Sequence, residues 1–399
     1  RIRFGQALLP MIGVEEAKAL LMSKVQRLPA EVMPLRSGGH TANDVLAPHD
    51  HPLFDCSAVD GYAFAFDAEV KAWSVVGEVP AGKVFTGELK RGECMRIFTG
   101  AMVPAGADTV VMQEFVQRHG DRITHTDGKL KAGGNVRKRG EQVRAGDRLL
   151  GAGSRLDASA IGLLASCGIR NVHGHRRPRV AVIVTGDEFS AEATPAPGRI
   201  FSSNDVMLLA ALAEHGIDAQ LLHATDDADA LRVAFEKAAA TADLVMTTGG
   251  ASVGDHDLIK PVLERMGAAI HFHGVAQKPG KPMLFATLRE RPVIALPGNP
   301  RAVMILFWEY VLPFLRAMQG ARDPWLRTEH LPITHVVTLK GDRAEFRAAQ
   351  VKDGRVTLLA DEGSHMLRSL VDADALAYFP ATMRTLNVNE PVEIHHIPR

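Results

Sequence analysis

Cysteine is scarce in this chain, and its scarcity excludes one class of protein. Three cysteines among 399 residues are too few for a disulfide-stabilised scaffold, and they fit a reducing compartment such as the cytoplasm. Net charge is missing too, because 46 basic residues balance 46 acidic residues. A neutral chain lacks the positive charge that attracts nucleic acid or an anionic membrane surface. We therefore expect neither nucleic acid nor membrane as a partner.

Long apolar runs are also lacking. A membrane-spanning helix needs about 20 consecutive apolar residues, whereas the longest candidate, residues 302–315, is interrupted by Glu309 and Pro313. What the chain does have is 46% hydrophobic and 23% charged residues, the composition of an ordinary globular protein. At roughly 100–200 residues per domain, its length predicts two to four domains.

The first half of the chain has helical segments on either side of a β-rich stretch. Apolar residues recur at helical spacing over 13–25, and a second helix is expected over 156–167, ended by Gly168. The stretch between them alternates turns with short β-prone runs, at 73–76, 95–98, 109–112 and 122–125. We expect the two helices to pack together, with the β unit inserted between them.

Residues 178–320 alternate strands with helices. The expected strands are 179–184, 243–246 and 293–296. The expected helices are 204–215, one capped by Asp226 that runs to about 240, 257–266, and a long helix after 300. This alternation predicts βαβ units that build a parallel sheet with helices on both faces.

Strand-like runs return after residue 324 and predict a small all-β domain. They cover 333–339, 355–359, 375–379 and 392–397. The chain is thus expected to have four parts. These are a helical linking domain (1–44 and 147–176), an inserted β domain (45–146), an α/β domain (177–322) and a C-terminal β domain (323–399).

Three of the strands expected in the α/β part end in unusual glycine-containing turns, two of which also carry acidic residues. The turns are Thr185-Gly186-Asp187-Glu188, residues 248–257, and Leu296-Pro297-Gly298-Asn299-Pro300. Ligands of open α/β sheets bind at the carboxyl ends of the strands, and glycine-rich backbone can cradle an anion. The adjacent carboxylates would repel that anion unless a divalent metal lies between them. Because Mg²⁺ binds carboxylates together with substrate phosphates, we expect a phosphorylated ligand with Mg²⁺.

Each of these turns has a plainer interpretation when it is taken alone. A tight connection that ends in an acidic helix cap would have the same residues, because acidic caps are favoured at helix starts. Three such turns at one edge of one sheet favour the binding site instead.

A loop with two lysines follows in Gln277-Lys278-Pro279-Gly280-Lys281-Pro282. Its prolines restrict the backbone, so both ammonium groups are held in place, and lysine is a suitable partner for phosphate or another oxyanion. The alternative is a solvated loop with two surface lysines.

The β unit contains three shorter motifs. Residues 54–63 place Asp55 and Asp60 among small residues, Thr99 follows an expected strand, and residues 133–141 join a glycine pair to three basic side chains. Taken singly, each of these motifs is a weak signal, and a basic triplet is usually a solvated face.

Taken together, the motifs match one known family. FDCSAVDGYA, TGA, GGNVRKRGE, TGDE, TTGGASVGDHD, KPGKP, LPGNP and GSHML occur in the order seen in the MoeA family. The chain thus resembles the molybdopterin molybdenumtransferases, a family that includes the E domain of gephyrin. The resemblance covers nearly the whole chain, and the set is specific although no single motif is.

The resemblance implies a fold and an assembly. The fold is an inserted, mainly β domain, a MogA-like α/β domain that binds molybdopterin, and a small C-terminal β-barrel domain. The assembly is an elongated homodimer, with its active cleft between the α/β domain of one subunit and the β unit of the other.

The resemblance also implies an activity, in molybdenum cofactor biosynthesis. Molybdate would be inserted into adenylylated molybdopterin, so that the dithiolene receives molybdenum, Mg²⁺ assists and AMP leaves. Such a reaction depends mainly on positioning and charge neutralisation. The resemblance also points to the molybdopterin adenylyltransferase as a protein partner.

Position by position, the resemblance implies three sets of site residues. The catalytic set is Asp60, Thr99, Asp187, Glu188 and Asp257. The substrate-binding set is Arg137, Arg139, Gly249, Gly250, Ser252, Lys278, Lys281, Pro297, Pro300 and Ser364. The metal set, for Mg²⁺, is Asp187, Glu188 and Asp257.

Three positions depart from the family pattern. Gln142 stands where the family usually has Asp, Ala302 where it usually has Ser, and Ala348 where a second Arg is common. These departures are the feature that favours one alternative, a diverged paralogue acting as a non-enzymatic molybdopterin or cofactor-binding scaffold. Another alternative is a molybdopterin adenylyltransferase, which shares a similar α/β domain but does not need the β insertion or the C-terminal domain.

Overall fold

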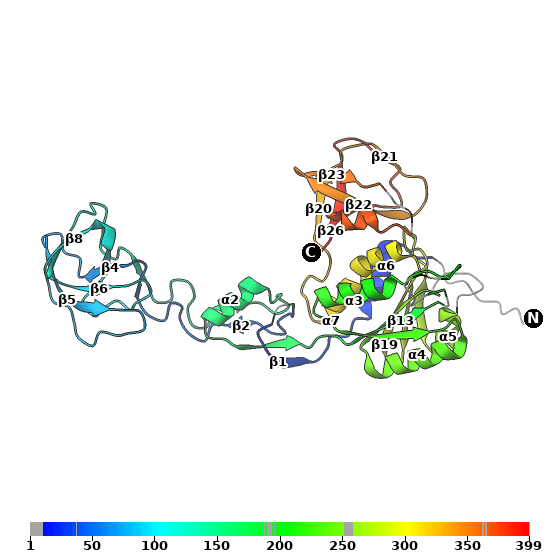
Figure 1. Ribbon diagram of the computed structural model, residues 1–399, viewed down its shortest axis with the longest axis horizontal. Helices are drawn as coiled ribbons and strands as arrows, with labels where there is room; N and C mark the ends of the chain where they lie inside the picture. Colours follow the sequence, from blue (N-terminus) through cyan, green and yellow to red (C-terminus); the bar gives the residue numbers. More distant parts are fainter. Residues whose placement is uncertain are drawn as a thin grey trace, which may run out of the picture.

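A computed structural model of the chain describes residues 11–36, 38–186, 188–189, 194, 196–250, 258–360, 363 and 365–398. The molecule is elongated (Figure 1), with a β unit at one end, a narrow linking region in the middle and a larger α/β and β body at the other end. None of the helices in these residues is long and apolar enough to cross a bilayer.

The distal β unit is built around a six-stranded sheet with the strand order β7-β4-β6-β5-β9-β8. Its strands are β4 (Gly61–Phe64), β5 (Trp73–Val79), β6 (Glu93–Ile97), β7 (Thr109–Met112), β8 (Val116–His119) and β9 (Arg122–His125). Beside the sheet, β3 (Cys56–Ser57) pairs with β10 (Val136–Arg137). The expected β unit is therefore confirmed, with two buried apolar clusters of its own.

The linking region is formed by two antiparallel strand pairs and one helix. β1 (Ala30–Pro34) pairs with β12 (Asn171–His175), and β2 (Val45–Leu46) pairs with β11 (Arg148–Leu150). Helix α2 (Ala158–Ser166) is capped by Asp157, whose side chain accepts from the backbone N–H of Ala160, and Gly168 follows it at φ +81°.

The expected packing of the two helical segments is wrong. Helix α1 (Val14–Ser23) buries Val14, Ala17 and Leu21 in the core of the body, whereas Leu164 of α2 belongs to a separate core in the linking region. Helical periodicity shows that a helix has an apolar face but not which face covers it. The four-part division of the chain stays a prediction.

The body contains a six-stranded sheet with the order β14-β13-β15-β19-β18-β16. Its strands are β13 (Val180–Thr185), β14 (Ala219–Ala224), β15 (Leu244–Thr248), β16 (Ala269–His273), β18 (Leu284–Leu288) and β19 (Arg291–Leu296). The first four strands in this order are parallel, as expected, and β18 and β16 extend the sheet in antiparallel fashion. The sheet is therefore mixed.

Helices cover both faces of this sheet, as expected. Val182 on one face packs with α1 and α3 (Asn204–Glu214), whereas Ile183 on the other packs with α4 (Ala228–Thr241) and α5 (Ile259–Arg265). The cap of α4 differs from expectation, because Asp227 rather than Asp226 accepts the hydrogen bonds of its first turn.

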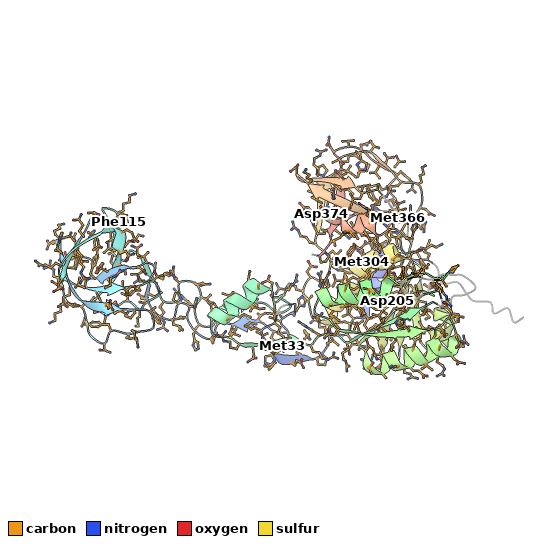
Figure 2. The ribbon with its side chains drawn as sticks, viewed as in Figure 1. Met33, Phe115, Asp205, Met304, Met366 and Asp374 are labelled. Carbon is orange, nitrogen blue, oxygen red and sulfur yellow. The ribbon has the colours of Figure 1, made fainter. Side chains whose placement is uncertain are left out.

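The long helix expected after residue 300 begins as α6 (Pro300–Leu306). It continues through a π-helical segment (Phe307–Val311) into α7 (Leu312–Met318). Met304 of α6 and Met366 lie where the body meets the C-terminal domain (Figure 2). The helix therefore packs against the C-terminal domain.

The C-terminal domain is a curled sheet with the order β17-β22-β24-β26-β20. Its strands are β17 (Gln277–Lys278), β20 (Thr328–Pro332), β22 (Ala344–Lys352), β23 (Arg355–Leu358), β24 (Ala375–Phe379) and β26 (Pro391–His396). The strand expected over 333–339 is instead the short β21 (Val337–Thr338), which pairs with β25 (Thr385–Leu386). β17 comes from the lysine loop of the α/β part, so this pairing joins the two domains.

Candidate active site

The three turns singled out in the sequence begin at neighbouring strand ends. They follow β13, β15 and β19, which are neighbours in the sheet, with Val184 beside Thr248 and Thr248 beside Leu296. Parallel strands end at the same edge, so the prediction that these turns share one edge is confirmed.

Gly249 allows two of these strand ends to come together. It has φ +91°, and a Cβ built on it would lie 2.6 Å from Thr185 Oγ1 and 2.8 Å from the carbonyl oxygen of Thr185. Any other residue would therefore push β15 away from β13. Gly250 follows with φ +60°, so this turn keeps its backbone open to a ligand.

Asn204 is a residue of this edge that the sequence analysis missed. Its Nδ2 donates to Thr248 Oγ1 at 2.7 Å and to the carbonyl oxygen of Gly298 at 2.8 Å, which ties the start of α3 to two strand ends. Its Oδ1 is buried without a hydrogen-bond partner in the described structure. An unpartnered buried oxygen can accept from, or coordinate, a ligand. In the sequence, Asn204 stands out only as a helix start.

The metal set is described only in part. Glu188 is exposed at the end of β13. Asp187, Ser252, Asp257 and Ser364 lie outside the described residues. Within those residues no three His, Cys, Asp or Glu side chains come together as metal ligands.

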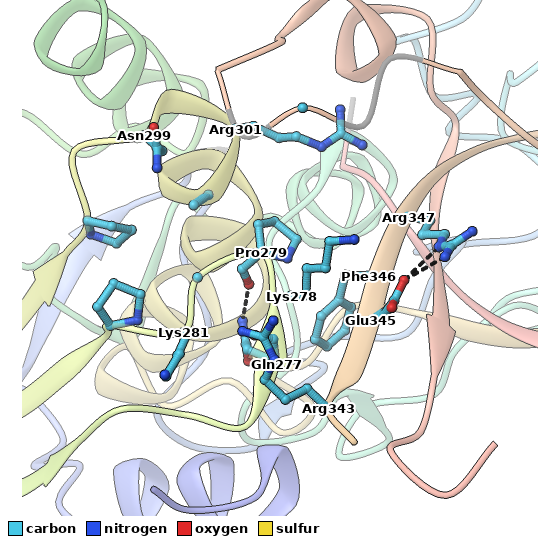
Figure 3. A pocket seen from close by; sticks show the side chains of 15 residues that line it. Gln277, Lys278, Pro279, Lys281, Asn299, Arg301, Arg343, Glu345, Phe346 and Arg347 are labelled. Atoms are coloured by element: carbon cyan, nitrogen blue, oxygen red, sulfur yellow. Dashed lines mark hydrogen bonds and ion pairs between the residues drawn. The ribbon is translucent and has the colours of Figure 1, made fainter. Parts of the chain in front are cut away.

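A cavity of about 550 Å³ lies between the body and the C-terminal domain (Figure 3). Its lining includes the predicted residues Lys278, Lys281 and Pro297. It also includes Arg301, Arg343 and Arg347, which the sequence analysis did not assign to the site. Among the described residues of the lining, Glu345 is the one acidic side chain and faces five cations, so the cavity suits an anionic ligand.

The lysine loop is held by buried hydrogen bonds rather than by its prolines alone. Tyr310 donates to Gln277 Oε1, and Gln277 Nε2 donates to the carbonyl oxygen of Pro279 at 2.9 Å. Both Gln277 and Tyr310 are fully buried. The backbone of Lys278 lies opposite that of Glu345 where β17 pairs with β22. Strand pairing with the C-terminal domain therefore fixes the position of Lys278.

Two arginines of the cavity make defined contacts. Arg301, only 1% exposed, donates to Ser369 Oγ at 2.5 Å and to the carbonyl oxygen of Met366 at 3.3 Å. Arg347 donates to Glu345 Oε2 through two nitrogens, at 2.7 and 2.8 Å. Arg301 therefore joins α6 to the C-terminal domain, and Arg347 neutralises Glu345.

Asp60 and Thr99 form a pair in the distal β unit. The backbone N–H and the hydroxyl of Thr99 both donate to Asp60 Oδ1 at 2.8 Å. The backbone donor is the main reason that the pKa of Asp60 lies below its usual value, and the hydroxyl adds to it. Asp60 is therefore an ionised carboxylate with a fixed direction.

The basic motif of the distal unit is largely ion-paired. Arg139 Nε lies 2.6 Å from Asp50 Oδ2, and Lys138 Nζ lies 2.8 Å from Asp55 Oδ2. Arg137 is exposed on β10.

Within one chain, the structure does not bring the two groups of predicted residues together. Asp60, Thr99, Arg137 and Arg139 lie in the distal β unit, whereas Glu188, the two lysines and Pro297 lie in the body at the other end of the molecule (Figure 1). Pro300 is the first residue of α6 and is not among the residues that line the cavity.

Three family models match the chain in sequence order. They are the MoeA N-terminal region (domain I and II) over residues 12–168, a probable molybdopterin binding domain over 181–317, and the MoeA C-terminal region (domain IV) over 331–397. The chain belongs to the MoeA family. The expected fold, an inserted β unit, a MogA-like domain and a C-terminal β domain, is thereby confirmed.

Relatives of this MoeA-family chain share its full length. A protein from a Nostoc species named molybdopterin molybdenumtransferase is 33% identical over 98% of this chain and 94% of its own. A protein of the same name from Haemophilus influenzae is 34% identical over 96% and 98%. A crystal structure of the molybdopterin biosynthesis MoeA protein from Pyrococcus horikoshii OT3 has a TM-score of 0.81 at 28% identity, over 97% and 100% of the two chains.

Proposed function

We propose that this protein inserts molybdenum from molybdate into adenylylated molybdopterin and releases AMP, as a transferase of molybdenum cofactor biosynthesis. The observation that carries this proposal is the basic cavity beside the glycine-rich strand ends, in a chain similar over its full length to molybdopterin molybdenumtransferases. The substrate phosphates and molybdate are all anions, which these cations neutralise.

The cavity residues act by binding and orienting. Lys278 and Lys281 are exposed on a loop that a hydrogen bond from Gln277 holds in place. The loop therefore loses little conformational entropy when molybdate binds. Arg343 adds a third cation at the cavity wall. Because the reaction breaks a bond to phosphorus, holding the anions in line and neutralising their charge supplies most of the catalysis.

Mg²⁺ would be held at the edge of the sheet by Asp187, Glu188 and Asp257. Carboxylate oxygens are the ligands that Mg²⁺ prefers, and the exposed carboxylate of Glu188 fits that donor set. The buried, unpartnered Oδ1 of Asn204 supplies a further oxygen at the same edge. When bound, the metal would neutralise the phosphate charge of the adenylylated substrate.

The distal β unit contributes to the site of a second copy. Asp60, Thr99, Arg137 and Arg139 cannot reach the cavity of their own chain, since they lie at opposite ends of the molecule. We therefore propose a homodimer with composite sites, in the cytoplasm, supplied with its substrate by a molybdopterin adenylyltransferase. A stable interface should bury more than about 1,000 Å², and light scattering at micromolar concentration would show the dimer directly.

The test is incubation with adenylylated molybdopterin, molybdate and Mg²⁺. AMP release coupled to formation of the molybdenum cofactor supports the transferase. Consumption of ATP with unadenylylated molybdopterin would instead identify an adenylyltransferase, and binding without turnover would identify a scaffold. Lys281→Ala should slow the reaction, whereas the matched control Lys237→Ala, at an exposed position of α4, should not.

A further inference from the structure

A second group of basic side chains lies where the linking region meets the body. His40 and Arg155 are paired in an isolated antiparallel bridge of the linking region. Arg316 lies on α7, and His215 ends α3. We call these four residues the junction cluster. None of them lines the cavity of the candidate active site.

The junction cluster separates two cavities. One has a volume of about 500 Å³ and is also lined by Arg322, Asp323 and Arg327, and the other has a volume of about 240 Å³. His40, Arg155 and Arg316 line both cavities, so the cluster forms the wall between them. A ligand in either cavity would contact the linking region and α7 at once.

The positive charge of the cluster is not balanced within the described residues. Arg316 is half-buried, and its guanidinium reaches only the carbonyl oxygens of Pro324 and Trp325, at 3.4 Å. Burial and then the charge of Arg155 lower the pKa of Arg316, while Asp323 acts in the opposite direction. Neither Arg155 nor Arg316 makes an ion pair with a carboxylate in the described structure. Two cations held together in this way are stabilised by an anion between them.

Two buried side chains of the smaller cavity have unpartnered polar atoms. His40 is 7% exposed and Gln319 is 3% exposed, and the structure shows no hydrogen bond to His40 Nδ1 or Gln319 Oε1 within the described residues. Burial, followed by Arg316 and Arg155, lowers the pKa of His40 to about 4. Its imidazole is therefore neutral at pH 7, with one N–H to donate. Buried polar groups without partners are rare and call for a ligand or water.

We propose that the junction cluster binds a phosphoryl dianion, either inorganic phosphate or the phosphate of a nucleotide. The oxygens of such an anion accept from Arg155, Arg316 and the imidazole N–H of His40. Its protonated oxygen, in monohydrogen phosphate, can donate to Gln319 Oε1. Glu214 and Asp323 also line these cavities but are exposed, so water screens their repulsion of the anion. The site is independent of the transfer reaction.

Calorimetric titration tests this proposal, provided that the other anion site is removed first. The protein used is the Lys278→Ala/Lys281→Ala double variant, titrated with inorganic phosphate and separately with AMP at constant ionic strength. Adding Arg155→Gln should weaken binding about ten- to hundredfold, the effect of losing one charge-assisted contact. Arg155 is exposed, so this change should not impair folding. The matched control is Arg232→Gln, which removes an exposed arginine on α4.

The outcomes separate the sources and the alternatives. Phosphate binding that Arg155→Gln weakens and Arg232→Gln leaves intact supports the proposal with free phosphate as ligand. The same pattern seen with AMP alone supports it with a nucleotide as ligand. Absence of binding by both probes overturns it, and so does binding that Arg155→Gln leaves unchanged.

Discussion

Two regions of this molecule contain basic side chains beside glycine-rich turns, and they differ in whether those side chains are ion-paired. In the distal β unit, Arg139 and Lys138 are ion-paired with Asp50 and Asp55. In the cavity of the body, Lys278 and Lys281 make no ion pair within the described residues. Charge that is neutralised inside the protein orders local turns, whereas unpaired charge in a cavity is available to a ligand. The comparison therefore favours the cavity of the body as the main anion-binding region.

The acidic residues show the same contrast. The carboxylate of Asp60 in the distal unit accepts two hydrogen bonds from one neighbour, Thr99, whereas the carboxylate of Glu188 at the sheet edge is exposed and accepts no hydrogen bond among the described residues. A carboxylate that is already satisfied keeps its position, and one without partners is available for a metal. We infer that the distal unit supplies fixed groups and that the body binds the mobile ions.

The largest effect is expected at the acidic turns of the body. Glu188→Gln or Asp187→Asn removes a charge proposed to hold Mg²⁺, so AMP release should fall by at least about a hundredfold, with an unchanged melting temperature. AMP release against Mg²⁺ concentration is the measurement. Full activity with normal Mg²⁺ dependence in either variant would show that the metal assignment is wrong.

The lysine loop should show the next largest effect. Lys281→Ala removes one charge-assisted contact of roughly 1.5–3 kcal/mol, so molybdate or the pterin phosphate should bind about ten- to hundredfold more weakly. Lys281→Arg should restore only part of the affinity, because a planar guanidinium does not replace a compact ammonium. Equilibrium binding of molybdate and of molybdopterin to each variant is the measurement.

An ion-paired cation of the distal unit should have much less effect on molybdate affinity than Lys281. Lys138→Ala should leave molybdate affinity within about twofold, since its ammonium is paired with Asp55 and an exposed ion pair contributes little. Equal losses in Lys138→Ala and Lys281→Ala would break the comparison between the two regions.

Much of this site could be predicted from the sequence, because it depends on local rules. Buried β-branched runs followed by glycine-rich turns predict strand ends, and parallel strands end at one edge. The ends of β13, β15 and β19 are therefore predicted to lie together, as the strand register confirms. The lysine loop is also predictable, since each of its two lysines is followed by a proline.

The rest depends on tertiary pairing that no local pattern contains. Arg343 and Arg347 reach the cavity because β22 pairs with β17 across a domain boundary. Helix α1 packs on the distant sheet of the body rather than on α2. Asn204 matters because its side chain bonds two strands that are 44 and 94 residues further along the chain.

A smaller effect is expected on the free energy of unfolding, where loss of the buried Arg301 should cost more than loss of the exposed Arg137. Arg301→Ala removes a buried guanidinium that donates to Ser369 Oγ and to the carbonyl oxygen of Met366, which should cost about 2 kcal/mol of the free energy of unfolding. Arg137→Ala in the distal unit changes an exposed side chain and should cost less than about 0.5 kcal/mol. Urea unfolding of both variants makes the comparison. A similar loss for the two would mean that Arg301 does not join the domains.

The smallest effect concerns the ionisation of Asp60. Its pKa lies below the usual value because Thr99 donates to the ionised form through its backbone N–H and its hydroxyl. Thr99→Val keeps the backbone donor and removes the hydroxyl, so the pKa of Asp60 should rise but stay below that of an unperturbed aspartate.

A carboxyl group whose pKa is lower in the folded state stabilises the fold above its unfolded pKa, about 3.9, and this contribution is lost as the pH falls further. The variant should therefore be slightly less stable than the parent near neutrality, and this difference should disappear as the pH falls below both pKa values. NMR titration of the Asp60 carboxyl carbon in both proteins measures the shift, and Thr126→Val, at another threonine of the same unit, serves as the control. An unchanged pKa in Thr99→Val would show that the backbone alone fixes this carboxylate.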